Sequence, residues 1–451
     1  MVALYATDKI ANYVASLNPG AVTESQLKTV ARALIDTYAV AIAGRNEPGV
    51  KAVQTYVAGY SGPVIASQWA NGSQLPIELA ALVNGYTADV LEFDDQIETL
   101  GAGISAVAMP ALCAVAEAVG AHGRQLAAAY AGTFEIAMKL ARALGNESFN
   151  RGWHIPSTVG LIAATAGCAF LASLSKAQVS HALGLAAAFA GGSQEQAGSM
   201  GKAMQAGQAA ASALRAMQLA RMGVESSRSA LDGPRGFAAL FSKDSALDHF
   251  DTMGRKPLEM EFIGIDIKKF PCSYATHRAI EAALALRHEY GLTANDILGV
   301  EVTAPRNLLR PLVHPRAVTG AEARFSMHYA LAAAFLDGKI KLASFADSEV
   351  QRPEAQAFYS RITLFEDEEV EEFPHFTLLK LMLKSGATVE RRVENARGTA
   401  RDPLTDGELA DKVRECFLYG KTEVWAKDFV NVALGMASAP VRDVLRAGRM
   451  A

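Results

Sequence analysis

Apolar residues recur at helical spacing through most of the first half of the chain. Thr23 and Gln26 form the sequence of a capping box, in which each side chain can bind a backbone N–H at the start of a helix. Val30, Leu34 and Tyr38 then lie on one face of the helix that follows. Alanine dominates these segments, which lets helix axes approach closely, and we interpret the apolar faces as core. The pattern predicts helices over 27–43, 77–91, 106–119, 125–144, 159–174, 178–190 and 203–222.

The pattern changes after about residue 268. Val300 and Val302 alternate with their neighbours, as expected for a strand over 297–304. Further strands are predicted over 361–365, 376–384 and 386–389, with helices over 326–335 and 348–360.

Helical spacing returns from Thr405 onward, with Leu409, Val413 and Phe417 on one face. The sequence therefore predicts a mainly α fold, in which a large all-helical domain carries a smaller, inserted α+β lid domain. The helical domain is expected to be discontinuous, formed by residues 1–267 with 405–451, and the lid by residues 268–404.

Composition narrows the classes of function. Hydrophobic residues make up 50% and charged residues 20% of the 451 positions, as in globular proteins. The net charge of −4, with acids and bases mixed, argues against a nucleic-acid partner. The four cysteines are scattered, which suits a reducing compartment. Asp8 and Lys9 interrupt any secretory signal, and the uncharged stretch 158–175 consists mainly of small residues, so we expect a cytoplasmic protein with no membrane partner.

Polar residues within or beside apolar helices are the candidates for chemistry. The sequence has no phosphate loop, dinucleotide fingerprint, nucleophile elbow or paired metal-ligand spacing, so no cofactor and no metal are expected. The acids of 92–95 arrive at a helix end, where the alternatives are a solvated terminus and a functional cluster. Negative charge is unfavourable at the C-terminal end of a helix, which favours the functional interpretation.

Two further elements place polar groups near the long helices. His154 directly precedes the helix expected at 159–174, with Ser157 or Thr158 as the expected cap. A lone histidine is more often structural. The glycine-rich stretch 191–202 ends in Lys202, and such a loop can present backbone N–H groups and a cation to an anionic ligand, or can be a flexible connector.

A third group lies where the two domains are expected to meet. Lys268, Ser273, Tyr274 and His277 follow one another there, as in an active site between domains. Arg324 and its neighbours lead into the helix at 326–335. Each of these groups is a weak signal when taken alone.

In their order along the chain, these motifs resemble the 2-methylcitrate dehydratase (MmgE/PrpD) family. The resemblance extends over about residues 5–445. The matching segments are 83–85 with 92–95, 152–154, 201–202 with 207–210, 231–237, 268–272 with His277, 324–326 with Tyr329, and 402–405.

The resemblance implies a homodimer with an active site between a helical domain and a lid, working without metal or organic cofactor on a small carboxylate substrate. His154 would act as base or acid, Lys202 and Lys268 would hold carboxylates, and Tyr329 would donate a proton or hold the substrate. The implied catalytic residues are His154, Lys202, Lys268, Tyr329 and Asp95. The implied substrate-binding residues are Glu92, Gln96, Ser273, His277 and Arg324.

The chain departs from the family pattern at two positions. A family histidine after the acidic motif falls here at about Gly103, with Ala102 as the alternative position, and Ser273 stands where decarboxylase-like members carry a second histidine. The primary hypothesis is a lyase or isomerase that moves a proton next to a carboxylate of a di- or tricarboxylate. The alternatives are an epimerase of an amino- or imino-dicarboxylate and a non-catalytic carboxylate-binding protein.

Overall fold

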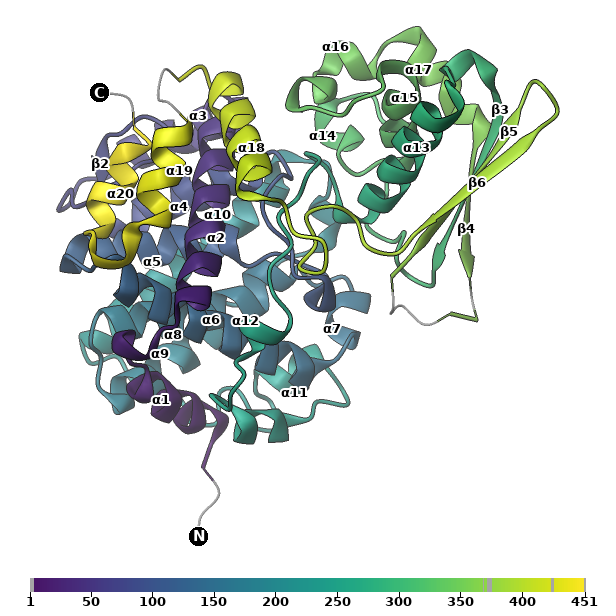
Figure 1. Ribbon diagram of the computed structural model, residues 1–451. Helices are drawn as coiled ribbons and strands as arrows, with labels where there is room; N and C mark the ends of the chain where they lie inside the picture. Colours follow the sequence, from purple (N-terminus) through teal and green to yellow (C-terminus); the bar gives the residue numbers. More distant parts are fainter. Residues whose placement is uncertain (1–3, 368, 371–374, 423–425, 450–451) are drawn as a thin grey trace.

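The computed structural model describes residues 4–367, 369–370, 375–422 and 426–449, and its fold is mainly α-helical, as predicted. Helices of the first part are α1 (Ala6–Ser16), α2 (Glu24–Gly44), α3 (Pro48–Ala58), α4 (Ile77–Asp89), α5 (Ser105–Val119), α6 (Gly123–Leu144), α7 (Glu147–Asn150), α8 (Leu161–Leu171), α9 (Lys176–Phe189), α10 (Met200–Arg221), α11 (Phe237–Phe241) and α12 (Glu259–Phe262). The chain ends with α18 (Asp406–Tyr419), α19 (Ala426–Leu434) and α20 (Val441–Ala447). Figure 1 shows these last three helices (yellow) beside α2 (purple).

A smaller α+β part lies to one side of the helices (Figure 1). Its helices are α13 (His277–Tyr290), α14 (Gly320–Ala323), α15 (Met327–Asp337), α16 (Asp347–Val350) and α17 (Pro353–Phe358). Its strands, β3 (Ile297–Pro305), β4 (Ile362–Asp367), β5 (Thr377–Leu383) and β6 (Thr388–Val393), form a sheet in the order β4-β3-β5-β6. β3 is parallel to β4 and antiparallel to β5, and β5 is antiparallel to β6. A two-stranded pair, β1 (Ala66–Ser67) and β2 (Gln74–Leu75), belongs to the first part.

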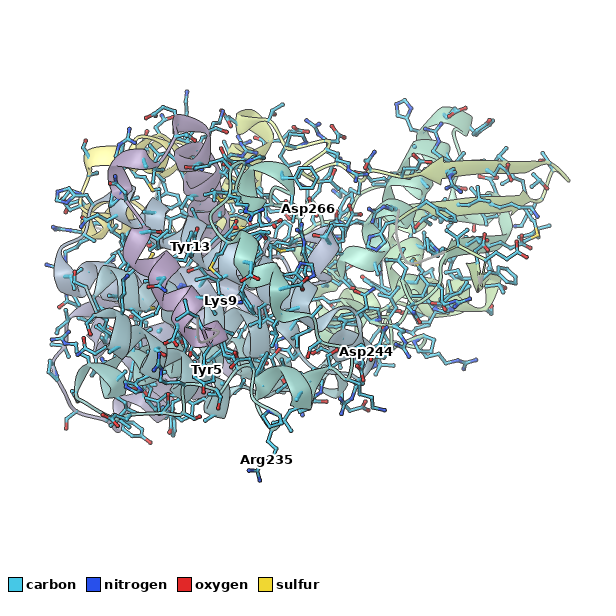
Figure 2. All side chains as sticks on the ribbon, turned by 90° about the horizontal axis from the view of Figure 1, so that it is seen from below. Tyr5, Lys9, Tyr13, Arg235, Asp244 and Asp266 are labelled. Atoms are coloured by element: carbon cyan, nitrogen blue, oxygen red, sulfur yellow. The ribbon has the colours of Figure 1, made fainter. Side chains whose placement is uncertain are left out.

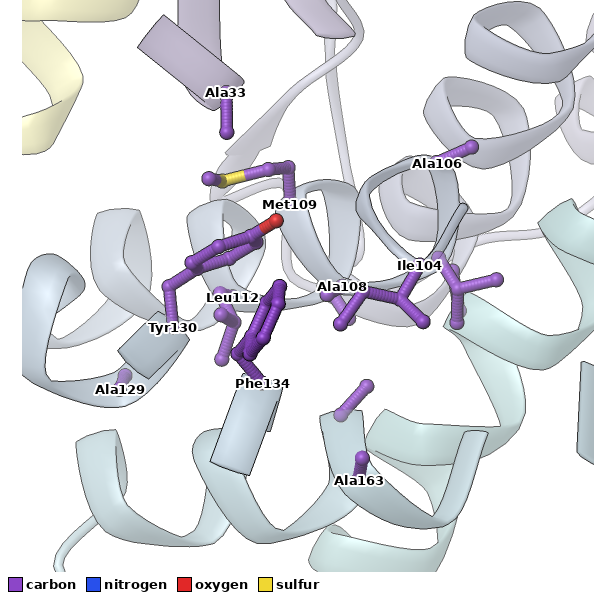
Figure 3. Close-up of a cluster of buried hydrophobic side chains, with 14 of the residues drawn as sticks. Ala33, Ile104, Ala106, Ala108, Met109, Leu112, Ala129, Tyr130, Phe134 and Ala163 are labelled. Atoms are coloured by element: carbon purple, nitrogen blue, oxygen red, sulfur yellow. The ribbon is translucent and has the colours of Figure 1, made fainter. Parts of the chain in front are cut away.

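The two parts have separate hydrophobic cores. The first core consists of residues from α1 to Ile267 and from Leu404 onward, together with Leu342. The second core consists of residues between Phe270 and Leu383. Figure 3 shows the first core around α5, with Met109 between Ala33 of α2 and the ring of Tyr130 of α6. Met109 and Tyr130 are fully buried, so these alanine-rich helices exclude water from their contacts.

Most predicted elements are confirmed, and two differ for local reasons. The capping box is present, since Thr23 Oγ1 accepts from the N–H of Gln26 at 3.2 Å and Gln26 Oε1 accepts from the N–H of Thr23 at 3.0 Å. The helix expected over 348–360 is broken, because Pro353 begins α17 and lacks the N–H that would continue α16. The helix expected from 159 begins earlier, with a π turn over Pro156–Gly160.

The described residues contain no helix that is long and apolar enough to cross a membrane.

Both connections between the parts pass close to Asp266, which Figure 2 places near their boundary. Its Oδ1 accepts from the N–H of Ala400 at 2.6 Å, on the returning connection. Its Oδ2 accepts from the N–H of Glu98 at 3.1 Å and from the Tyr274 hydroxyl at 3.2 Å. One buried carboxylate therefore ties the outgoing segment, the returning segment and the loop after α4 together.

Two glycines allow α4 and α10 to pack with their backbones almost in contact. A Cβ built on Gly207 would lie 2.5 Å from the carbonyl oxygen of Leu82, and one built on Gly85 would lie 3.0 Å from the Cα of Gly207. Any larger side chain at these positions would force the helices apart. The end of α4 and the start of α10 are thereby held at a short, fixed separation.

We expect Gly207→Ala to destabilise the protein, because overpacking a tight helix contact costs about 1–3 kcal/mol. The control is Gly407→Ala in α18, where an added Cβ would meet only Thr405 Oγ1 at 3.8 Å. Urea denaturation should give a lower free energy of unfolding for Gly207→Ala and an unchanged or slightly higher one for Gly407→Ala. Equal effects of the two substitutions would contradict the close-packing argument.

Candidate active site

A cavity of about 620 Å³ lies between the two parts. The helical part contributes the segment after α4, the loop before α8 and the glycine-rich loop before α10. The smaller part contributes the loop after β3 and Phe325. The charged and ionisable side chains that line the cavity are Asp89, Glu92, Asp94, Glu98, Arg151, His154, Glu195, Lys202, Lys268, Tyr274, Arg310, His314 and His375.

The centre of the cavity wall is an ion cluster around Glu92. Its carboxylate accepts from Lys202 Nζ through Oε2 at 2.5 Å and from Lys268 Nζ through Oε1 at 2.9 Å. Lys202 also donates to Asp89 Oδ1 at 2.8 Å, and Lys268 lies 3.8 Å from Asp94 Oδ1. Glu92 has a positive φ of 52°, an unfavourable conformation for a residue with a side chain, which the bonds to two ammonium groups offset.

The cluster gives its carboxylates unequal proton affinities. Burial opposes ionisation of Glu92, but the ammonium groups of Lys202 and Lys268 outweigh it and lower the pKa of this carboxyl. Burial raises the pKa of Asp89 to about 7, although Lys202 acts in the opposite direction. Burial lowers and the neighbouring carboxylates raise the pKa of Lys202, with a net increase that keeps the amine charged.

The acids of this cluster are also the described residues best placed to hold a cation, since oxygens of Asp89, Glu92 and Asp94 lie within 4.8 Å of one another. Lys202 and Lys268 already bind these oxygens, however. Their two positive charges occupy the place that a cation would take, so the arrangement suits an internal ion network better than a metal site.

His154 lines the same cavity from the loop that precedes α8. Its Nδ1 lies 2.9 Å from Ser157 Oγ, and that hydroxyl lies 3.1 Å from the carbonyl oxygen of His154. If the Ser157 hydroxyl donates to the carbonyl, Nδ1–H donates to Ser157 and Nε2 is left as a proton acceptor. Ser157 thus orients the imidazole, and neither it nor Thr158 serves as the expected N-cap.

Burial is the main reason that the pKa of His154 is lowered to about 3, and the charge of Lys202 adds to the shift. The imidazole is therefore neutral at physiological pH and can accept a proton when a bound anion offsets the positive charge beside it.

Six of the predicted site residues line the cavity and four do not. Those in the lining are Glu92, Gln96, His154, Lys202, Lys268 and Ser273. Those outside it are Asp95, His277, Arg324 and Tyr329.

Asp95 and Tyr329 are engaged elsewhere in this structure. Asp95 points into the helical core, where its Oδ2 accepts from Ser105 Oγ, which lies 2.6 Å from the Tyr130 hydroxyl. The Tyr329 hydroxyl donates to the carbonyl oxygen of Ser344 within the smaller part, and Tyr329 is fully buried. Burial raises the pKa of this phenol, which suits a structural bond rather than proton transfer.

His277 and Arg324 lie behind the cavity wall. His277 is fully buried, with Nε2 3.3 Å from the carbonyl oxygen of Cys272. Arg324 stacks its guanidinium over the ring of Phe345 at 5.6 Å, and its carbonyl oxygen accepts from the N–H of Ser273 at 2.8 Å. Arg324 thus positions Ser273 through its backbone.

The structure adds cavity residues that the sequence interpretation did not select. Asp89 is the last residue of α4. Negative charge is unfavourable at the C-terminal end of a helix, so the reason that favoured a functional role for the acids of 92–95 also holds for Asp89. Asp94 lay within the acidic motif. His314 and His375 come from the smaller part, and no local pattern distinguishes them. His314 Nε2 lies 3.0 Å from the carbonyl oxygen of Ala197, which belongs to the helical part.

The structure shows how much room there is at Gly103 and Ala102, the two positions considered for the missing histidine. A Cβ built on Gly103 would lie 2.1 Å from the carbonyl oxygen of Asp95, so this position cannot hold a larger side chain without a backbone shift. Ala102 lines the cavity and is only partly buried. The alternative position, Ala102, is therefore the one at which an imidazole could reach the cavity.

Comparison with known proteins gives consistent matches over nearly the whole chain. Models of the MmgE/PrpD N-terminal domain and the MmgE/PrpD C-terminal domain match residues 8–249 and 270–425. Cis-aconitate decarboxylase of Homo sapiens is 26% identical over 422 residues, which cover 90% of this chain and 87% of that protein. The protein of the same name from Mus musculus is 27% identical, with 90% and 86% covered. Cis-aconitate decarboxylase-like protein oryM of Aspergillus oryzae is 25% identical, with 91% and 90% covered.

Histidine burial gives a prediction about stability and pH. Burial is the main cause that lowers the pKa of His277 to about 3. At pH values between its usual pKa of about 6.5 and about 3, the unfolded chain binds a proton at His277 that the folded chain does not bind. The free energy of unfolding is therefore unaffected by this group at neutral pH and decreases as the pH falls below about 6.5.

We therefore expect the difference in free energy of unfolding between the wild type and His277→Gln to shrink between about pH 7 and pH 4, by at most about 1.4 kcal/mol per pH unit. Urea denaturation at a series of pH values measures this difference. Parallel curves for the two proteins would show that His277 titrates normally in the folded state.

Proposed function

Because the chain belongs to the MmgE/PrpD family, as its ordered motifs predicted, we propose that it is a lyase acting on a small di- or tricarboxylate by general acid/base proton transfer. The observation that carries this proposal is the placement of two ammonium groups, Lys202 and Lys268, and one neutral imidazole, His154, on the wall of one cavity. The named relatives are cis-aconitate decarboxylases, which favours a substrate with several carboxylates.

The chemistry follows from the charges of these groups. A hydrogen on the carbon next to a carboxylate becomes removable when cations stabilise the negative charge that develops on the carboxylate oxygens. Lys202 and Lys268 would donate hydrogen bonds to that carboxylate, and their hydrogen bonds to Glu92 would weaken. His154 Nε2 would accept the proton, and its pKa would rise as the anionic substrate enters.

The smaller part would act as a lid over this chemistry. The centre of its Phe325 ring lies 6.0 Å from Lys202 Nζ. Its Arg310 donates to Oδ1 of Asn150, a residue of the helical part, at 3.0 Å. Excluding water strengthens the interaction between the lysines and a bound carboxylate. We also expect the homodimer and the cytoplasmic location predicted from the sequence.

An epimerase of an amino- or imino-dicarboxylate is the second candidate. The specific observation that favours it is Ala102, because the position that can present the family imidazole carries none. Removing and returning one proton needs no leaving group, and therefore makes fewer demands on a second acid.

Reaction with a panel of carboxylates in deuterium oxide, followed by NMR, tests the proposal. The panel consists of cis-aconitate, citrate, 2-methylcitrate and iminodisuccinate. We expect loss of water or of CO₂ from at least one tricarboxylate. Deuterium at carbon without bond cleavage would support the epimerase instead. Binding without any exchange would refute both enzymatic proposals and support a carboxylate-binding protein.

We expect Lys268→Met to lower turnover at least tenfold, because a charge-assisted bond to a carboxylate contributes about 1.5–3 kcal/mol. Its matched control is Lys269→Met, since the Lys269 side chain is 44% exposed and pairs with Glu281 at 3.7 Å, away from the cavity lining. Circular dichroism should show both variants folded. Wild-type turnover in folded Lys268→Met would remove Lys268 from the site.

A further inference from the structure

The carboxylates of the ion cluster outnumber its ammonium groups by one. Glu92 binds both Lys202 and Lys268, so each lysine has part of its charge balanced there. Asp89 shares Lys202, and Asp94 reaches Lys268 only at 3.8 Å. A negative charge in excess is costly among side chains as buried as these and would repel an anionic substrate. One bound proton removes the excess.

Asp89 is the carboxyl group on which that proton is favoured. It is the last residue of α4, where the partial negative charge of the helix end opposes a carboxylate. Its side chain is only 3% exposed, although it borders the cavity. Its Oδ1 accepts from Lys202, and its Oδ2 is buried without a hydrogen-bond partner among the described residues. Asp94 Oδ1 also has no hydrogen-bond partner among them, but it lies 3.8 Å from the Lys268 ammonium group, whose charge favours the ionised form there. An oxygen without a donor is the natural place for a hydroxyl hydrogen.

We propose that Asp89 is the general acid of this cavity and works with His154 as the base. The proposal rests on the function proposed above and adds the group that returns or delivers the proton. A neutral acid and a neutral base then stand on the same cavity wall, separated in proton affinity by their surroundings. The raised pKa of Asp89, about 7, and the lowered pKa of His154 agree with this assignment.

The proton balance is complete without any co-reactant. In an elimination, His154 takes the proton from carbon, the electron pair forms the double bond, and the hydroxyl leaves with the proton of Asp89 as water. In a decarboxylation, the C–C bond breaks, CO₂ leaves, and Asp89 protonates the carbon that keeps the electron pair. In either case, the Asp89 carboxylate regains a proton from solvent, and His154 releases any proton it took.

Asp89→Asn is the decisive variant, because an amide keeps an acceptor oxygen for Lys202 and cannot donate an acidic proton. With the panel carboxylate that the wild type converts fastest, we expect kcat to fall about 10²–10⁴-fold while KM stays within a few fold. The limb of the pH–rate profile near pH 7 that reports the acid should disappear. Asp89→Glu retains an acid and should restore part of the rate together with a shifted limb.

Asp94→Asn is the comparison within the same cluster, and we expect it to keep the acid limb. Infrared spectra of wild type and Asp89→Asn at pH 6 give a readout that does not depend on turnover. Burial also raises the pKa of Asp36 and Asp95, so these groups contribute carboxylic acid bands to both proteins. The wild-type spectrum minus the variant spectrum should therefore show the carbonyl stretch of one additional protonated carboxylic acid.

The outcomes separate the two proposals. If the wild type converts a panel member and Asp89→Asn retains its rate and pH profile, Asp89 is not the acid while the proposed function stands. A difference spectrum without the carboxylic acid band refutes the protonated state of Asp89 whatever the turnover. If no panel member reacts, the proposed function fails and the catalytic role of Asp89 falls with it.

Discussion

The shared carboxylate of Glu92 is the interaction on which the arrangement of this molecule depends. It joins three segments that are far apart in sequence: the end of α4, the start of α10 and the connection that leaves the helical part at Lys268. Buried charges are stable only when each has a partner, so none of the three segments can move away without leaving a charge unpaired. The glycine contact between α4 and α10 sets the distance over which Lys202 must reach. Fold and cavity are thus determined by the same contacts.

Much of the architecture could be predicted because its causes are local. Helices such as α2 and α18 follow from the spacing of their apolar residues, and the capping box at Thr23 follows from two side chains three positions apart. The strands β3 and β5 were recognised from alternation and branched or long apolar side chains. The single helix predicted over 348–360 is divided into α16 and α17, because Pro353 lacks the N–H that would continue α16.

Sequence motifs predict which segments contribute to the candidate site, but not which side chains of those segments face the cavity. His154, Lys202 and Lys268 lie in the cavity because each sits at the end of a helix or at the connection between parts. Sequence does not determine which way a side chain points after a helix ends. Asp94 therefore faces the cavity while Asp95, the next residue, points toward Ser105. His314 and His375 are brought to the cavity by the topology of the smaller part, which no local pattern contains.

The first hydrophobic core is built from two segments that are far apart in sequence, and this affects how the chain folds. Phe417 and Val413 of α18 complete a core that begins with α1 and α2, so its contacts span most of the sequence. During synthesis the early helices must wait, with apolar faces incompletely covered, until the whole α+β part and the last helices have been made. The smaller core has no such dependence and can form earlier. Contacts of this sequence separation slow folding and lengthen exposure to aggregation, so production of this protein should be more sensitive to truncation near α18 than to changes within the sheet.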